Sequence, residues 1–421
     1  MKFRNEVSRT IITQIFILLF GIGTSIVLNR LLGPTLKGEL VALLVIPQLI
    51  VAFTNLGLGT SLSYHLGKGK YPEADIIKTN FVCSLVLGII GVGIGWFVLR
   101  NSYPELNILF RYFILGMIIF GLWFDYLPDI FLGNGKMGVY NYWHLLKAIT
   151  EFLLIVVFVL AITNKLQGAI TGIFIQNLSL WILSIILFMK LALKGKINFS
   201  YLKEGLNFGY KIFFTNVLIF LSYRLDILLL KWLSNTTQIG YYSTAVSLAE
   251  KLWIIPGAIS LVLYSKIVSS KNAENYDSNK VLRVTRISFW VITGIAIVSI
   301  FLIKPVIEIL YSARFLPSVT PYIILLPGTI ALVVVKLLMA EIVGKWGKPE
   351  LSIIGMLIVV FTNIGLNLIL IPKLNIAGAA IASTVAYTVQ FVYFITVYNK
   401  VTHIPVKEIF ALRKKDFTMS N

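Results

Sequence analysis

The feature that most constrains this chain is a series of twelve apolar segments, each long enough to cross a bilayer. A helix needs about 20 mostly apolar residues to span the hydrocarbon core. Backbone polar groups in lipid must hydrogen-bond within the segment, so these segments predict helices, and they lack the alternation of barrel strands. They cover roughly 10–29, 39–63, 79–99, 109–132, 143–163, 167–189, 207–230, 239–264, 284–303, 320–343, 351–371 and 376–399. The sequence therefore predicts an all-α polytopic membrane protein.

The composition excludes a water-soluble protein and offers no catalytic chemistry. Charged residues make up 13% of the chain, whereas a soluble domain carries about 25%. The lone Cys83 and three widely separated histidines provide neither an internal disulfide nor a metal-ligand cluster. Walker-type loops, nucleophile elbows and HExxH motifs are absent from the sequence. We expect no enzymatic activity, no metal and no cofactor.

Short sequence marks of the first half return in the same order in the second half. Gly-Lys-Met-Gly at 135–138 returns as Gly-Lys-Trp-Gly at 344–347, and Lys-Leu-Gln-Gly-Ala at 165–169 has a counterpart at 373–379. Such a repeat in a membrane protein predicts two parallel six-helix lobes with something between them, which is the architecture of a transporter. We place an N-terminal lobe at 1–195, a C-terminal lobe at 196–400 and a basic tail at 401–421.

The distribution of basic residues predicts the topology. With both termini in the cytoplasm, 23 of the 37 Lys and Arg residues fall in cytoplasmic segments and nine in outer segments, as the positive-inside rule requires. This distribution also accounts for the net charge of +19, because inner loops face anionic headgroups. Nucleic-acid binding would require a basic soluble face, which the sequence lacks.

Ten of the ionisable residues within the predicted spans are candidates for a functional role. Such residues are costly in lipid and tend to mark pathways or pair with one another. They are Asp125, Asp129, Lys147, Glu151, Arg224, Asp226, Glu250, Lys251, Lys336 and Glu341.

Arg224 is the strongest candidate for binding a ligand. An arginine keeps its charge, and its planar fork matches the oxygens of a phosphate. Arg224 and Asp226 are two residues apart, so they do not face each other on a helix and each needs another partner. Lys147 and Glu151 are four apart and can instead neutralise each other locally.

The embedded carboxylates are candidates for binding a coupling ion. Asp125 and Asp129 share one helical face, where two like charges raise a carboxyl pKa and suit proton or sodium coupling. Asp129 can equally lie in an ordinary interface near the loop that follows. The remaining coupling candidates are Glu151, Glu250 and Glu341.

Two strings resemble the polysaccharide flippases of bacteria. The first is Arg30-Leu-Leu-Gly-Pro34 with Gly38, followed by Asn55-Leu-Gly57, Tyr64 and Gly67-Lys68. The second is Tyr223-Arg-Leu-Asp-Ile-Leu-Leu-Leu230, followed by Gly240-Tyr-Tyr-Ser-Thr-Ala245. With these strings the chain resembles the Wzx-like branch of the multidrug/oligosaccharidyl-lipid/polysaccharide (MOP) exporter superfamily over its whole length. Trp123-Phe-Asp-Tyr126 departs from the pattern that this family commonly shows in its fourth helix.

The resemblance implies a function and a location. It implies two six-helix lobes around a central cavity that opens alternately to either side. It also implies that the protein moves an undecaprenyl-diphosphate-linked oligosaccharide from the inner to the outer leaflet of the bacterial plasma membrane, for O-antigen, capsule or exopolysaccharide synthesis. Arg30, Arg224 and Asp226 match motif positions and become candidate substrate contacts. Lys147, Lys251 and Lys336 are further candidates for a cationic cavity. Expected partners are the lipid-linked oligosaccharide, membrane lipids, a polysaccharide polymerase and glycosyltransferases, with no nucleic acid. Arg30 can also simply snorkel beside its Gly-Pro turn.

Three alternatives remain open. A cation-coupled drug or metabolite exporter of the same fold would need a compact pocket and a coupling carboxylate. A peptidoglycan-precursor flippase usually carries helices beyond twelve, and their absence in this sequence counts against it. A non-transporting scaffold or a polymerase would belong to another class, and the polymerase would need a long outer loop, which the sequence lacks.

Overall fold

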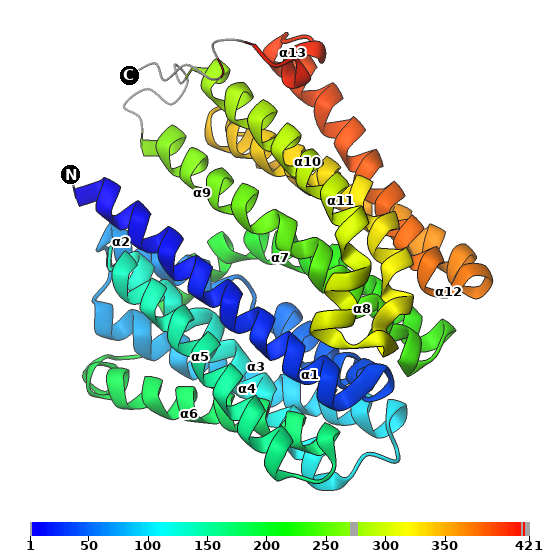
Figure 1. Cartoon of the computed structure of the whole chain (residues 1–421). Helices are drawn as coiled ribbons and strands as arrows, with labels where there is room; N and C mark the ends of the chain where they lie inside the picture. Colours follow the sequence, from blue (N-terminus) through cyan, green and yellow to red (C-terminus); the bar gives the residue numbers. More distant parts are fainter. Residues whose placement is uncertain (1, 270–276, 414–415, 417–421) are drawn as a thin grey trace. The chain divides into compact units, whose positions relative to one another are not determined.

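The computed structural model describes residues 2–269, 277–413 and 416, and these residues form helices and no strand (Figure 1). The chain divides into two compact units, Met1–Phe220 and Leu221–Asn421. Helix α7 (Phe199–Leu233) runs through the point of division. The predicted lobe boundary at 195, which was drawn from a hydrophilic joint, stays a prediction.

Unit 1 is drawn from blue to green in Figure 1. Its helices are α1 (Lys2–Thr54), α2 (Leu58–Lys68), α3 (Glu73–Ser102), α4 (Ile108–Gly133), α5 (Met137–Ala161), α6 (Lys165–Lys194) and the first part of α7. Unit 2 contains the rest of α7, α8 (Thr236–Glu250), a 3₁₀ turn (Lys251–Trp253), α9 (Ile254–Ser269), α10 (Ser278–Tyr311), a second 3₁₀ segment (Ala313–Ser318), α11 (Val319–Gly344), α12 (Pro349–Thr402) and α13 (Lys407–Phe410).

The expectation of about twelve membrane segments is confirmed. Ten helical spans among the described residues are long and apolar enough to cross a membrane. Two of these spans are each broken once, α1 at Gly33 (φ 69°, ψ 178°) and α12 at Asn375 (φ 49°, ψ −128°). Gly33 precedes Pro34, and both the positive φ and the missing amide of proline interrupt the helical ladder. Each broken span therefore supplies two crossing segments.

In unit 1, buried polar contacts and one close glycine contact hold neighbouring helices against each other. The Trp123 indole donates to Ser184 Oγ at 2.7 Å, and Tyr126 donates to the carbonyl of Asn55 at 2.9 Å. Gly57 has φ 69°, and a Cβ on it would lie 2.1 Å from the carbonyl oxygen of Gly209. The start of α2 and the first half of α7 thus meet through bare backbone.

In unit 2, α11 forms the centre of the packing. It contacts α8, α9, α10 and α12, and it buries sixteen of its residues. Its side chains Val333, Val334 and Leu338 are fully buried. A helix that is apolar on all sides belongs in such a core.

The end of the chain folds back onto α10. The backbone turns at His403 (φ 57°), and Asn399 donates to the Ile404 carbonyl at 2.8 Å. Ile409 is fully buried, and the Phe410 ring packs against Phe289 with a centroid distance of 5.0 Å. We call residues 403–416, as far as they are described, the C-terminal strap.

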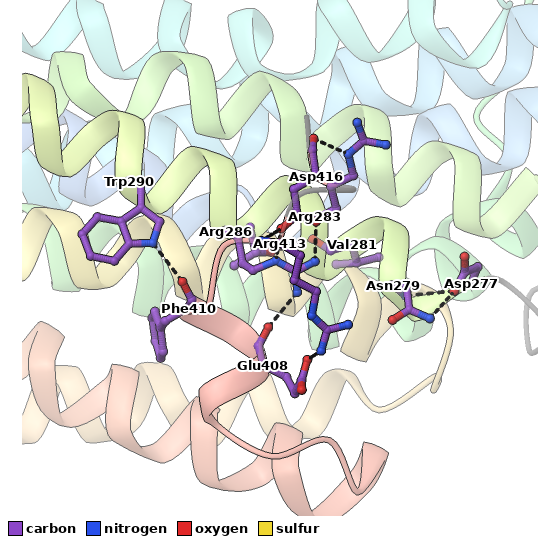
Figure 2. A network of polar contacts seen from close by, with 11 residues as sticks. Asp277, Asn279, Val281, Arg283, Arg286, Trp290, Glu408, Phe410, Arg413 and Asp416 are labelled. Atoms are coloured by element: carbon purple, nitrogen blue, oxygen red, sulfur yellow. Dashed lines mark hydrogen bonds and ion pairs between the residues drawn. The ribbon is translucent and has the colours of Figure 1, made fainter. Parts of the chain in front are cut away.

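Charged side chains hold the strap to α10 (Figure 2). Arg286 donates two hydrogen bonds to the Asp416 carboxylate and one to the Glu408 carbonyl. Arg283 donates to the Asp416 carbonyl at 2.8 Å, and Arg413 forms an ion pair with Glu408. The predicted basic tail therefore carries acidic residues that pair with arginines on α10 and within the strap.

Candidate substrate and coupling sites

The α7 helix directs Arg224 and Asp226 into two different surroundings. Residues two apart on a helix point in widely different directions. The expected consequence is observed, because Arg224 pairs with Glu250 at the end of α8 while Asp226 lies in a separate buried cluster. Unit 2 therefore contains two polar sites that share one helix.

The first site is centred on Arg224. Its Nη1 atom donates to Glu250 Oε1 at 3.0 Å and to the Tyr223 carbonyl at 3.3 Å. The side chains of Arg224 and Glu250 are 32% and 26% exposed. The ion pair is therefore only half-buried, and a ligand can approach it.

Lys336 on α11 packs against aromatic rings beside this site. Its Nζ lies 4.8 Å from the Trp253 ring centroid and 5.6 Å from that of Tyr223. Such cation–π contacts stabilise an ammonium group without neutralising it. Lys251 follows Glu250 directly, and the Glu250 carboxylate lies close enough to both ammonium groups to act on their charge.

We call Arg224, Glu250, Lys251 and Lys336 the cationic cluster. Three positive groups and one carboxylate give it a net charge of +2 when all are ionised. The sequence predicts each of these residues as a separate membrane-embedded charge, and the fold brings them together.

The second site surrounds Asp226, which is 4% exposed. Its carboxylate accepts hydrogen bonds from Tyr242 at 2.5 Å, Ser383 at 2.5 Å and Asn367 at 2.7 Å. Asn363 donates to Ser383 Oγ at 3.1 Å, and its own oxygen accepts from Asn367 at 2.8 Å. We call these five residues the Asp226 cluster.

Every side chain of the Asp226 cluster is buried, yet one oxygen lacks a partner. Tyr242, Asn363, Asn367 and Ser383 are at most 1% exposed. Asn367 Oδ1 is buried without a hydrogen-bond donor. A buried carboxylate beside an unsatisfied amide oxygen and two hydroxyls offers oxygen ligands to a proton or a small cation.

Sequence reasoning names Asp226 but misses the four residues around it, because neutral side chains carry no charge signal. One pattern could have revealed part of the cluster. Asn363 and Asn367 are four residues apart in an apolar helix, which places two amides on one face.

Other candidate residues lie in unit 1. The Lys147 Nζ lies 5.4 Å from the Phe124 ring centroid, and Lys147 and Lys37 both act on the charge of Glu151. That Lys147 and Glu151 neutralise each other locally stays a prediction. Arg30 is exposed near the break in α1.

The two aspartates of α4 differ in how far they are described. Asp129 is half-buried and lies near Tyr140. The side chain of Asp125 lies outside the described part of the structure, so its candidate role stays a prediction.

Glu341 occupies a packing position at the end of α11. It is fully buried, and it accepts hydrogen bonds from Ser278 at 2.5 Å and from Tyr398 at 2.8 Å. Lys345, one turn later, lies 3.8 Å from the same carboxylate. Protein groups from α10, α11 and α12 thus surround it, which favours a structural role. Its role in coupling stays a prediction.

One family model matches part of the chain. Residues 138–320 match the family model described as polysaccharide biosynthesis protein. No curated protein sequence shows a significant match.

Solved structures with the same fold include three transporters. The lipid II flippase MurJ in an inward closed conformation superposes with a TM-score of 0.73 at 17% identity, over 95% of this chain and 88% of that chain. An inward-facing multidrug resistance MATE family transporter of the MOP superfamily gives a TM-score of 0.76 at 14% identity, over 94% of this chain and 99% of that chain. A MOP superfamily transporter from Pyrococcus furiosus Vc1, described as having a reverse polarity of its binding pocket, gives a TM-score of 0.66 at 14% identity, over 94% of this chain and 96% of that chain.

These likenesses cover nearly the whole chain, and the structures are transporters with two lobes. The predicted fold class is therefore confirmed. So is the predicted resemblance, through the family match and the fold together. The chain is a multi-pass membrane protein with the fold of the multidrug/oligosaccharidyl-lipid/polysaccharide exporter superfamily.

Proposed function

We propose that this protein is a flippase for undecaprenyl-diphosphate-linked oligosaccharides and that it supplies a surface polysaccharide such as O-antigen, capsule or exopolysaccharide. It moves the lipid from the inner to the outer leaflet of a bacterial plasma membrane by alternating access, with both termini in the cytoplasm. The polysaccharide biosynthesis family match and the flippase-like fold support this class of cargo. A polymerase and glycosyltransferases are the proposed partners.

The observation that carries the proposal is the net charge of the cationic cluster. Each phosphate of a diphosphate diester carries about one negative charge at neutral pH. The charge of +2 on Arg224, Glu250, Lys251 and Lys336 therefore balances such a headgroup. A diphosphate inside the membrane is prohibitively costly without cationic partners, and the cluster provides them at a half-exposed position.

The Asp226 cluster is the proposed site of coupling. Transport against a gradient requires a second solute that binds differently in the two states of the cycle. A proton or sodium ion on the Asp226 carboxylate would also satisfy Asn367 Oδ1 by rearrangement of the surrounding hydrogen bonds. We therefore assign Asp226 to coupling instead of direct substrate contact.

Reconstitution into liposomes tests the proposal. A fluorescent undecaprenyl-diphosphate oligosaccharide is placed in both leaflets, and its exchange is measured by quenching from outside. We expect wild-type protein to accelerate exchange, and Arg224→Ala and Lys336→Met to reduce it about 10- to 100-fold, as expected for loss of a hydrogen-bonded charge partner. Exposed residues provide matched controls, Arg314→Ala and Lys304→Met. No exchange by the wild type would refute the proposed function.

A cation-coupled exporter of a smaller solute is the second candidate, and the buried Asp226 cluster is the observation that favours it. The same liposomes distinguish the two. A proton or sodium gradient that drives a cationic dye but leaves the lipid-linked sugar unmoved would select the exporter. In either case, Asp226→Asn is expected to abolish the response to the gradient.

A further inference from the structure

Two of the arginine–carboxylate pairs of unit 2, Arg286–Asp416 and Arg224–Glu250, differ in a way that bears on the cationic cluster. Arg286 and Asp416 form two hydrogen bonds, and their side chains are 3% and 2% exposed. Arg224 meets Glu250 through a single nitrogen, Nη1, and the two are 32% and 26% exposed. The Arg286–Asp416 pair is buried and holds the C-terminal strap to α10. The second pair is about one-third exposed, so a competing anion can reach it.

From this contrast we infer that Glu250 is an internal counter-anion that occupies the phosphate position on Arg224 when no substrate is bound, and that it thereby sets the charge which the site accepts. The inference rests on the proposed function and deepens it. Glu250 acts as a specificity-determining residue, whereas Arg224 and Lys336 hold the headgroup.

The charges of the cluster support this role. Without the Glu250 carboxylate, Arg224, Lys251 and Lys336 would place three positive charges together in the empty protein, which is unfavourable in a membrane. With it, the remaining charge is +2. A diphosphate diester balances this charge, while a monophosphate diester leaves one cation unpaired. Glu250 therefore favours the diphosphate over lipids with a single phosphate.

The backbone at Glu250 allows the carboxylate to leave Arg224. Helix α8 ends at Glu250, and Lys251–Trp253 form a 3₁₀ turn before α9 begins. Pro256 follows within α9 and removes one backbone donor. A short 3₁₀ stretch within a spanning segment often marks a hinge. When a phosphate takes the Arg224 fork, the displaced carboxylate remains beside Lys251 and within reach of the charge on Lys336.

The test compares two substrates that differ by one phosphate. Liposomes receive undecaprenyl carrying the same fluorescent disaccharide through either a diphosphate or a monophosphate, and KM and maximal rate are measured for wild type, Glu250→Gln and Glu250→Asp. Glu250→Gln removes the competing carboxylate and should lower the KM of the diphosphate lipid about tenfold. It should also shrink the preference over the monophosphate lipid, because a single phosphate can then take the Arg224 position without having to displace a carboxylate. Glu250→Asp should keep the preference of the wild type.

Controls separate this inference from the proposed function. Glu308→Gln removes an exposed carboxylate from α10 and should change neither parameter. If Glu250→Gln keeps the wild-type KM and the wild-type preference, the inference fails, while flipping by the wild type would still support the proposed function.

A binding measurement keeps the inference testable even if flipping is absent. Purified protein is titrated with inorganic pyrophosphate, and the fluorescence of Trp253, which lies against Lys336, is isolated by comparison with Trp253→Phe. Tighter pyrophosphate binding by Glu250→Gln than by the wild type is the expected result. Equal binding by the two proteins would overturn the counter-anion role.

Discussion

The guanidinium of Arg286 meets the carboxylate of Asp416 through two hydrogen bonds, of 2.9 Å and 2.7 Å, and thereby fixes the C-terminal strap to α10 (Figure 2). Both side chains are at most 3% exposed. A buried pair of this kind adds little stability compared with an apolar pair, but removing one partner leaves a buried charge unpaired. The strap therefore depends on both residues together.

Asp416→Asn is expected to destabilise unit 2 by about 3 kcal/mol, because it leaves the buried Arg286 without its counter-charge. The measurement is unfolding in mixed detergent micelles, followed by circular dichroism. Glu308→Gln, which removes an exposed carboxylate from α10, the helix that carries Arg286, should change the free energy of unfolding by less than about 0.5 kcal/mol. A similar stability of Asp416→Asn and wild type would contradict the role of the pair.

The same pair predicts how stability depends on pH. The hydrogen bonds from Arg286 lower the pKa of Asp416 below its usual value. The stabilisation is then complete above the unfolded pKa of about 3.9 and is lost only as the pH falls through the lower folded pKa. The difference between wild type and Asp416→Asn should stay constant from about pH 5 to 8 and shrink below about pH 4. A loss of this difference between pH 7 and 5 would contradict the assignment.

The membrane segments were predictable from the sequence because apolar runs of the required length are a local property. The break at Gly33 also follows from the local Gly-Pro pair. The separation of α1 from α2 at residues 55–57 and the 3₁₀ turn after Glu250 were not predicted, since both fall inside segments that read as continuous apolar spans. Apolar composition alone does not distinguish a straight helix from a broken one.

The residues of the candidate sites were only partly predictable. Charges within spans identified Arg224, Glu250, Lys251 and Lys336 one by one. Their proximity depends on how α7, α8 and α11 pack, which the repeat pattern does not specify. In the Asp226 cluster, the residues around the carboxylate were themselves not identified. Its four neutral members carry no charge signal in the sequence, and they become recognisable only when three helical segments bring them around one carboxylate.

Gly57 is expected to tolerate no side chain. In Gly57→Ala the added Cβ would lie 2.1 Å from the Gly209 carbonyl oxygen, and the residue also holds φ 69°. The clash and the strain together should lower the free energy of unfolding by about 3 kcal/mol or more. Gly69→Ala is the matched control, because Gly69 has φ 64° but open space around it. The control should lose only about 1 kcal/mol, and equal losses in the two variants would argue against the close contact of α2 with α7.

The break in α12 predicts an unusual order of substitutions at Asn375. Its φ of 49° with ψ of −128° lies in a region that glycine occupies far more readily than other residues. Asn375→Gly should therefore be more stable than Asn375→Ala by about 1–2 kcal/mol, although glycine normally destabilises helical segments. Thermal unfolding of the two variants provides the measurement. Greater stability of Asn375→Ala would mean that α12 can continue through this position.

The Asp226 cluster predicts strong coupling between Tyr242 and Asp226. Tyr242→Phe removes a buried donor 2.5 Å from the carboxylate and should lower the free energy of unfolding by about 1.5–3 kcal/mol, the range for hydrogen bonds to charged groups. Tyr322→Phe removes a hydroxyl that donates to the neutral Ser299 and should lower it by about 1 kcal/mol. In a double-mutant cycle with Asp226→Asn, the loss from Tyr242→Phe should shrink, because the charged acceptor is gone. Additive losses in the cycle would show that the tyrosine acts independently of the carboxylate, and Asp226 would then rely on Ser383 and Asn367 alone.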